Sequence, residues 1–343
     1  MSNSSSREAA LRSAVPGEIR MQRMQRTLAE TEHIAEFSVF GGPVHSLGLR
    51  LGLVRQNSNA IAAGFVLGIT LWLVLVALAA LEGYITTIFS LDRIAGHVRL
   101  LVAIPLLFAC EGYLAPRMAT FVRALITAGV VRRDVEWHFA RELERIRRLR
   151  KAWLPDVLCL ALAVILSLTG PLLPLPSSST SQTDLAAGQM TLTGQWYWLV
   201  CLPMFRFVFL RWIWRLGLWW YFLFRLSRMD LHLVSSHPDR AGGLGYLEVV
   251  HSEFTFMILA ISAVLAATFA ESILDGSMTV TMLYPALAFV LILDTILFVA
   301  PLFLFAPKLW LSRVQGLDRY MILASRYVED FDKKWIRDAE ANR

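Results

Sequence analysis

The stretch Ala60-Ile-Ala-Ala-Gly-Phe-Val-Leu-Gly-Ile-Thr-Leu-Trp-Leu-Val-Leu-Val-Ala-Leu-Ala-Ala-Leu81 contains no charged residue. An α-helix needs about 20 apolar residues to cross the hydrocarbon core of a bilayer, so this stretch predicts a transmembrane helix over 60–82. Three further runs, at 155–175, 251–272 and 281–305, meet the same requirement. The 343-residue chain is 56% hydrophobic and only 17% charged, whereas soluble domains average about 45–50% and about 25%. These proportions exclude an ordinary soluble enzyme and predict an all-α, polytopic membrane protein.

Two weaker apolar runs raise the predicted number of spans to six. The run 196–217 qualifies despite its internal arginines, and the run 98–116 is interrupted by Glu111 and Gly112. We include 98–116 because, without it, the basic stretch 132–151 would lie across the membrane from the other basic segments.

The first span carries small residues at every fourth position, Ala60, Gly64 and Gly68. Small residues at this spacing let two helix backbones approach closely inside a membrane. The pattern therefore predicts a helix contact along this face of the span.

The basic residues are distributed as in a membrane protein with both termini in the cytoplasm. A six-span topology places 28 of the 33 Lys and Arg in cytoplasmic segments and one, Arg93, in the outer loops, as the positive-inside rule requires. The net charge of +6 therefore reflects topology and does not indicate a nucleic-acid partner. The predicted organisation is a cytoplasmic segment 1–59, a six-helix transmembrane domain 60–307 with a cytoplasmic helix 132–153 and a cytoplasmic loop 225–249, and a cytoplasmic C-terminal helix 308–343.

Three charges at membrane depth, Arg206, Asp294 and Glu111, are candidate functional residues because burying a charge in the bilayer is costly. One interpretation is structural: Arg206 pairs with Asp294 to fix helix packing, and Glu111 is a second acceptor. The other is that Arg206 lines a hydrated path and attracts anions. Arg211 and Arg215 lie nearer the inner boundary among aromatic residues, which is typical of cations that snorkel toward anionic lipid at the cytoplasmic face.

Two cytoplasmic stretches have the periodicity of amphipathic helices. In 134–153 one apolar face is formed by Val135, Phe139, Leu143, Ile146, Leu149 and Trp153, and it would lie on anionic lipid or pack against another cytoplasmic helix. In the tail, apolar residues recur with alternating gaps of four and three, as in a coiled coil. This seam comprises Trp310, Val314, Leu317, Met321, Ala324, Val328, Phe331 and Trp335. It predicts homo-oligomers, or packing of the tail against 134–153 within one subunit.

The loop between the fourth and fifth spans is the most motif-like segment of the chain. It includes His237, Asp239, Arg240, Gly242, Gly243 and Gly245. The leading interpretation is a structured turn, in which Asp239 caps or bends the chain after a proline and the glycines permit positive φ or close backbone approach. An anion site in a glycine nest comes second, and a metal site comes last because the spacing matches no known ligand pattern. We predict no metal and no cofactor.

The string His237-Pro-Asp-Arg-Ala-Gly-Gly-Leu-Gly-Tyr-Leu247 resembles one found in a family of polytopic bacterial membrane proteins of unknown activity. The resemblance covers about a dozen residues and the surrounding six-span layout. It implies a bacterial inner membrane, and it implies no activity and no site residues.

Three functions are compatible with these patterns, of which the leading one is an oligomeric, anion-leaning ion channel tuned by Arg206 and Asp294. The second is a membrane scaffold or signalling component that binds a cytoplasmic partner. The third is an ion-coupled secondary transporter that uses Asp294, Glu111 or Arg206. The chain contains no Walker A, Gly-x-Ser-x-Gly, Cys-x-x-Cys or His-Glu-x-x-His motif, so we do not expect an enzyme.

Overall fold

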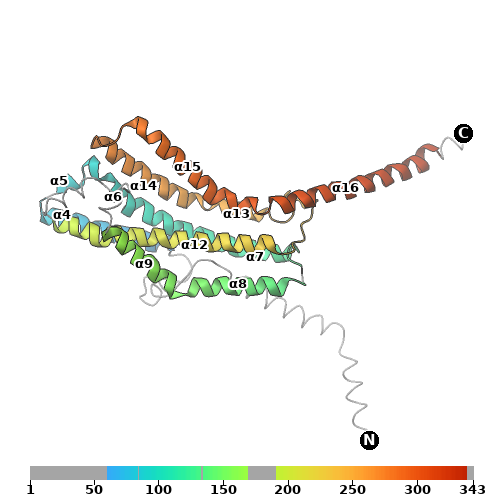
Figure 1. Ribbon diagram of the computed structural model, residues 1–343, viewed down its shortest axis with the longest axis horizontal. Coiled ribbons are helices and arrows are strands. Elements are labelled where there is room, and N and C mark those ends of the chain that lie inside the picture. Colours follow the sequence, from blue (N-terminus) through green and yellow to red (C-terminus); the bar gives the residue numbers. More distant parts are fainter. Residues whose placement is uncertain (1–59, 84, 133, 169–190, 338–343) are drawn as a thin grey trace, which may run out of the picture.

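A computed structural model describes residues 60–83, 85–132, 134–168 and 191–337, and within these ranges the chain is helical apart from turns, loops and one isolated β-bridge between Val131 and Leu231. Figure 1 shows long helices that run side by side. In chain order the elements are α4 (Ala60–Leu81), α5 (Ile85–Ile88), η1 (Leu91–Arg93), α6 (Ile94–Val98), η2 (Arg99–Ala103), α7 (Ile104–Thr127), α8 (Glu136–Lys151), α9 (Trp153–Leu168), α11 (Leu192–Trp196), η4 (Tyr197–Cys201), α12 (Leu202–Arg228), α13 (Tyr246–Ser252), α14 (Thr255–Leu274), α15 (Val280–Phe303), α16 (Ala306–Phe331) and η5 (Asp332–Arg337).

The predicted all-α class is confirmed for the described residues, and the number of candidate spans is four or five. Four helical segments are long and apolar enough to cross a membrane, namely Ile61–Leu81, Ile94–Thr127, Tyr246–Leu274 and Val280–Phe303. The pair α8 and α9, bent by 43°, makes a fifth if it is one span. The predicted span 196–217 is helical, but the arginines of α12 keep it out of this set. Three parts of the predicted organisation lie outside the described residues. They are the cytoplasmic segment 1–59, the end of the third span at 169–175 and the end of the tail at 338–343.

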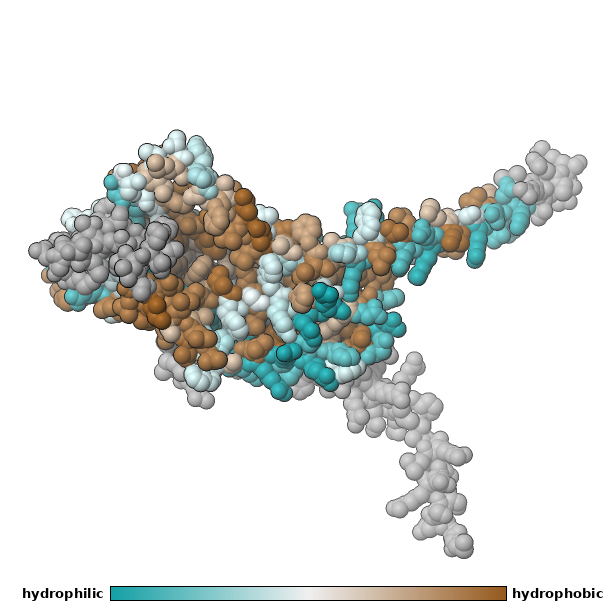
Figure 2. Space-filling model, viewed as in Figure 1, coloured by the Kyte–Doolittle hydropathy of each residue, from teal (hydrophilic) through white to brown (hydrophobic). Residues whose placement is uncertain are grey.

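The surface of the helical bundle is strongly apolar. Figure 2 shows hydrophobic residues over much of the long helices, with hydrophilic residues concentrated over α8 and along α16. On α15, Phe289, Leu291 and Ile292 are 66%, 59% and 60% exposed. Soluble proteins rarely expose apolar patches of this extent, so this surface fits contact with lipid.

The close contact predicted along the first span is confirmed. Helix α4 packs against α7 and the π-helical turn before it. A Cβ atom on Gly64 would lie 2.5 Å from the Cβ of Phe108, and one on Gly68 would overlap the carbonyl oxygen of Leu100. Only glycine lets the two backbones come this close, because it lacks the Cβ that would clash.

Helix α8 packs on α12, which supports the interpretation that 134–153 packs against a helix for the first part of its predicted apolar face. Helix α12 has 27 residues and is about 40 Å long, so it exceeds a hydrocarbon core of about 30 Å. Phe139, Leu143 and Ile146 of the predicted apolar face are buried, and the ring centroids of Phe139 and Phe222 on α12 lie 6.3 Å apart. Leu149 and Trp153 of the same face stay 37% and 66% exposed. An ion pair between Glu142 and Arg225 joins the same two helices. The alternative partner, the C-terminal tail, is not in contact with α8: Figure 1 shows α16 projecting away from the bundle.

Candidate functional site

Two π-helical turns mark equivalent places on α7 and α12. Arg99–Ala103 precedes Pro105, and Tyr197–Cys201 precedes Pro203. A proline ring clashes with the carbonyl group four residues earlier and offers no N–H to it, and a wider turn relieves that clash. Inserted turns of this kind occur frequently at functional sites.

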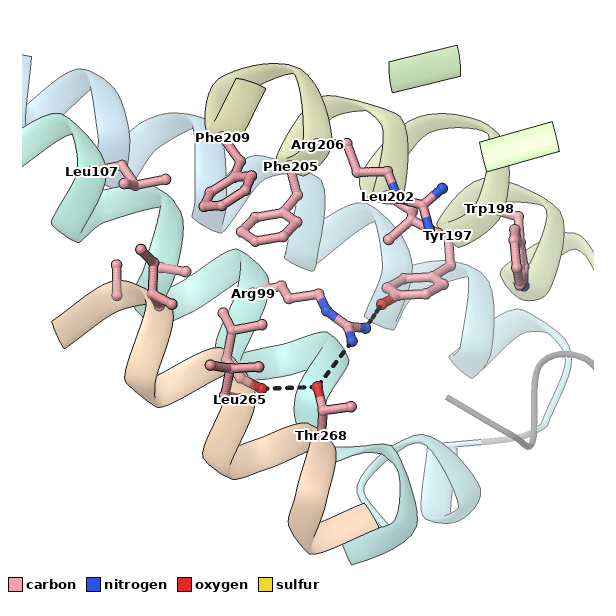
Figure 3. Close-up of a pocket in the computed structure, with 14 residues that line it drawn as sticks. Arg99, Leu107, Tyr197, Trp198, Leu202, Phe205, Arg206, Phe209, Leu265 and Thr268 are labelled. Carbon is pink, nitrogen blue, oxygen red and sulfur yellow. Dashed lines mark hydrogen bonds between the residues drawn. The ribbon is translucent and has the colours of Figure 1, made fainter. Parts of the chain in front are cut away.

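Both π-helical turns line one cavity of about 290 Å³, and α14 forms its third wall. Most of its wall is apolar, with side chains such as Leu107, Phe205 and Phe209. Figure 3 shows two arginines, Arg99 and Arg206, that approach this cavity from different helices. The cavity therefore combines apolar walls with two cationic groups inside the helical bundle.

Arg99 is held by neutral partners. Its side chain is buried, at 6% exposure. It donates hydrogen bonds to the hydroxyl of Tyr197 at 2.6 Å and to Oγ1 of Thr268 at 3.2 Å (Figure 3). Because neither acceptor is ionised, these bonds satisfy the guanidinium without neutralising its charge.

Arg206 also has a neutral partner, and the predicted pair with Asp294 does not form. Its Nη1 donates to Oγ of Ser167 on α9 at 3.0 Å. Helix α15, which carries Asp294, meets α12 near Trp220, whose indole N–H donates to the carbonyl oxygen of Leu297 at 2.9 Å. That contact lies 14 residues, or about 21 Å, along α12 from Arg206, and this separation explains why the two charges do not meet.

Glu111 pairs with an arginine that we expected to lie at the lipid interface. Arg215 on α12 donates from Nη1 and Nη2 to the two carboxylate oxygens of Glu111 at 2.7 and 3.0 Å. The Arg215 side chain is only 5% exposed. Arg211 likewise pairs with Asp156 on α9 at 3.5 Å, with both side chains under 20% exposed, at 13% and 16%. The prediction that these two arginines snorkel toward lipid was wrong, because α7 and α9 supply carboxylates inside the bundle.

The charges around the cavity are unbalanced. The described residues that line it include Arg99 and Arg206 and no Asp or Glu. The nearest acidic residue along α14 is Glu271, one turn beyond Thr268, and its Oε1 accepts a hydrogen bond from the backbone N–H of Ala95 at 2.7 Å. The cavity is therefore a positively charged, largely apolar space, which favours an anion.

We did not single out Arg99 or Tyr197 from the sequence, although a local repeat marks both. Arg99-Leu-Leu-Val-Ala-Ile-Pro105 and Tyr197-Trp-Leu-Val-Cys-Leu-Pro203 have the same length, share Leu and Val at the third and fourth places, and end in proline. The first residues of the two repeats are the ones that hydrogen-bond across the cavity. A search for short repeats that end in proline would have identified both π-helical turns.

The loop predicted as a structured turn closes on its own aspartate. The carboxylate of Asp239 accepts hydrogen bonds from the backbone N–H groups of Ala241 at 3.0 Å, Gly243 at 3.0 Å and Gly245 at 2.8 Å. The ring Nδ1 of His237 lies 2.7 Å from Oδ1 of the same carboxylate. The N–H groups that could have formed an anion-binding nest are thus already occupied, which favours the turn over an anion site.

Backbone geometry explains the glycines of this loop. Arg240, Gly242 and Gly243 adopt positive φ angles of 57°, 65° and 99°. A Cβ on Gly243 would overlap the side chain of Val130, which lies beside the β-bridge that joins this loop to the end of α7. The glycines therefore serve chain reversal and close packing.

Asp239 makes the stability of the protein depend on pH. Burial raises its pKa, but the hydrogen bonds from Gly245, Ala241, Gly243 and His237 outweigh this and lower the pKa to about 2, against 3.8 for a free side chain. A carboxyl group with a lowered pKa stabilises the folded state above the unfolded pKa, and this contribution disappears as the pH falls through about 2. We expect Asp239→Asn to cost about 2 kcal/mol at neutral pH.

The measurement is the difference in unfolding free energy between the wild type and Asp239→Asn in detergent, from pH 7 down to pH 2. The difference should shrink below about pH 4 and approach zero near pH 2, because protonation removes the charge from the wild type as the substitution does. A difference that stays constant over this range would contradict the role assigned to the carboxylate.

A metal site is not formed by the described residues, among which no group of three or more His, Cys, Asp or Glu side chains could hold an ion.

Comparison with known proteins finds no family model, no curated protein and no solved structure that matches this chain. The site is therefore interpreted from its own chemistry.

Proposed function

We propose that this chain is an integral membrane protein that admits anions through its transmembrane region, as an anion-leaning channel. The observation that carries the proposal is the pair Arg99 and Arg206 at one cavity, both hydrogen-bonded to neutral groups. An arginine buried in a bundle normally has a carboxylate partner, as Arg215 has. Two arginines whose hydrogen-bond partners are neutral attract a counter-charge from outside the protein, as the basic residues of anion pores do.

The topology that we propose has six spans and cytoplasmic termini, in a bacterial inner membrane. Four helical segments are apolar enough by themselves to cross a membrane, and α9 and α12 supply the two further spans. The arginines that keep α12 from qualifying pair with side chains of α7 and α9, so they face protein and not lipid. In this topology Arg99 and Thr268 lie toward the outer face, and Phe209 lies nearer the middle of the membrane.

We further propose that the protein is a homodimer joined by α16. The eight predicted seam residues, from Trp310 to Trp335, are all exposed, and α16 projects from the bundle (Figure 1). In heptad terms Val314, Met321 and Val328 take a positions, while Trp310 and Leu317 take d positions. Valine at a with leucine at d favours two strands.

The charges beside the seam fit a parallel arrangement. Arg313 lies at a g position and Asp318 at the following e position, so a parallel pair places Arg313 of one copy opposite Asp318 of the other. Copies inserted in one membrane with the same topology are necessarily parallel, and α16 leaves the bundle at the same end in each.

The channel is tested by recording from the purified protein in planar bilayers under a KCl gradient. We expect a reversal potential that favours chloride, and we expect Arg206→Ala to lower the chloride-to-potassium permeability ratio about tenfold, which corresponds to about 1.4 kcal/mol of lost attraction. Arg228→Ala is the matched control, since Arg228 is exposed at the far end of α12 and stacks on Phe224. If Arg206→Ala leaves a folded protein with unchanged conductance and selectivity, the anion path is wrong.

A scaffold or signalling function is the second candidate, and the projecting helix α16 favours it. In that case the exposed seam binds a cytoplasmic partner and no solute crosses the membrane. The same recordings separate the two candidates, because a scaffold gives no current with either the wild type or Arg206→Ala.

A further inference from the structure

The polar groups of the cavity lie toward one end of it. Tyr197 and Thr268 bind the Arg99 guanidinium, and the Arg206 side chain extends along α12 toward Tyr197 (Figure 3). Leu107 and Phe209 lie toward the other end (Figure 3). The cavity thus has a cationic end and an apolar end.

The presence of both ends favours an anion with an alkyl portion over a small inorganic anion. A chloride or phosphate ion would meet the two guanidinium groups and leave the apolar end without a ligand. Burial of apolar surface contributes about 0.8 kcal/mol for each CH₂ group, so a ligand with an alkyl portion gains at the apolar end as well as at the arginines. Pockets that bind small molecules have this composition, mostly apolar with a few convergent polar groups.

The direction of the cavity agrees with the direction of lipids. Along α7 the chain passes from Arg99 at the cationic end to Leu107 at the apolar end. In the proposed topology the cationic end faces outward and the apolar end faces the membrane centre. An amphiphile in the outer leaflet has the same orientation, with its charged group outward and its alkyl chain inward.

We propose that this cavity binds an anionic amphiphile, with a carboxylate or phosphate between Arg99 and Arg206 and an alkyl chain against Leu107, Phe205 and Phe209. This inference rests on the proposed function, because the amphiphile would bind to the same two arginines that we propose attract anions. Arginine suits both headgroups, because its planar fork of N–H donors matches the oxygens of carboxylate and phosphate. The ligand is either a free fatty acid or the headgroup and chain of an anionic phospholipid.

Binding is tested by native mass spectrometry of the purified, delipidated protein in a neutral detergent. The probes are decanoate, the uncharged decanol and the short acetate, each titrated separately. We expect one decanoate per chain, bound at least tenfold more tightly than either decanol or acetate. If decanol binds as tightly as decanoate, the arginines do not contribute to binding. If acetate binds as tightly as decanoate, the apolar end does not contribute. Either result overturns the proposal.

Two variants localise the ligand. Arg206→Gln should weaken decanoate binding at least tenfold, whereas the control Arg228→Gln should leave it unchanged. Phe209→Trp keeps both charges and fills the apolar end, so it should weaken decanoate binding but not acetate binding. This variant tests the proposal if Arg206→Gln does not fold. Decanoate binding that survives both cavity variants would place the ligand elsewhere and overturn the inference.

The source of the ligand is resolved by a parallel titration with phosphatidylglycerol and phosphatidylcholine vesicles. Tight, Arg206-dependent binding of phosphatidylglycerol with weaker binding of decanoate supports a lipid, and the reverse supports a free fatty acid. Together with the recordings in planar bilayers, these titrations also separate the two proposals. Chloride current without decanoate or phosphatidylglycerol binding refutes the amphiphile and keeps the channel, whereas amphiphile binding without current refutes the channel and keeps the amphiphile.

Discussion

Replacing Arg215 with leucine is expected to destabilise the protein by about 3–5 kcal/mol, one of the two largest effects that we predict. The substitution leaves the Glu111 carboxylate inside the bundle, 13% exposed, without the two charge-assisted hydrogen bonds that it accepts at 2.7 and 3.0 Å. A buried carboxylate that loses its bidentate guanidinium partner costs more than the attraction itself, because much of its desolvation is no longer offset. Unfolding in detergent, followed by thermal or denaturant titration, measures this cost.

The double variant Arg215→Leu with Glu111→Leu is the control. It removes both charges and keeps apolar side chains in their place, so it should recover most of the lost stability. Arg148→Leu is the matched single variant, since its ion pair with Glu144 joins two side chains that are 80% and 53% exposed, and it should cost about 1 kcal/mol or less. A double variant as unstable as Arg215→Leu would show that the arginine acts through packing and not through Glu111.

The helical class and the close contacts of the first span follow from local properties of the sequence. An uncharged run such as 60–81 satisfies the length of a bilayer by itself, and glycines at four-residue spacing lie on one helix face wherever the helix packs. The turn at Asp239 was also predictable, since a proline, an aspartate and several glycines within nine residues have strong local preferences.

The partners of the intramembrane charges were not predictable in the same way. Counting residues from the helix ends places Arg206 and Asp294 at similar levels, but it does not show which helices are neighbours or at what level they meet. Helix α15 meets α12 at Trp220, 14 residues beyond Arg206. The structure sets α12 between α7 and α9, so Arg215 meets Glu111, Arg211 meets Asp156 and Arg206 meets Ser167. The cavity could not be predicted for the same reason, because Arg99 and Tyr197 come together only when α7 and α12 lie side by side.

The seam of α16 leads to the second large effect, which concerns assembly. Leu317 is 55% exposed in the single chain and takes a central d position in the proposed coiled coil. Leu317→Glu removes a buried leucine from each copy, worth about 1.5–3 kcal/mol, and the two copies together lose about 3–6 kcal/mol. We therefore expect the dissociation constant of the dimer to rise by about 10² to 10⁴. Light scattering in detergent should report a monomer at concentrations where the wild type is a dimer.

The control for this substitution lies on the same helix. Ile322 is 57% exposed, close to the exposure of Leu317, but it takes a b position away from the seam, so Ile322→Glu should leave the dimer intact. In the proposed parallel dimer, Arg313 of one copy faces Asp318 of the other. Arg313→Glu and Asp318→Arg should each weaken the dimer, because each places like charges opposite one another in a parallel pair. Their combination restores opposite charges in reversed order and should restore assembly. If both glutamate variants, at Leu317 and Ile322, remain dimeric, the seam is not the interface, and its exposed apolar side chains need a different partner.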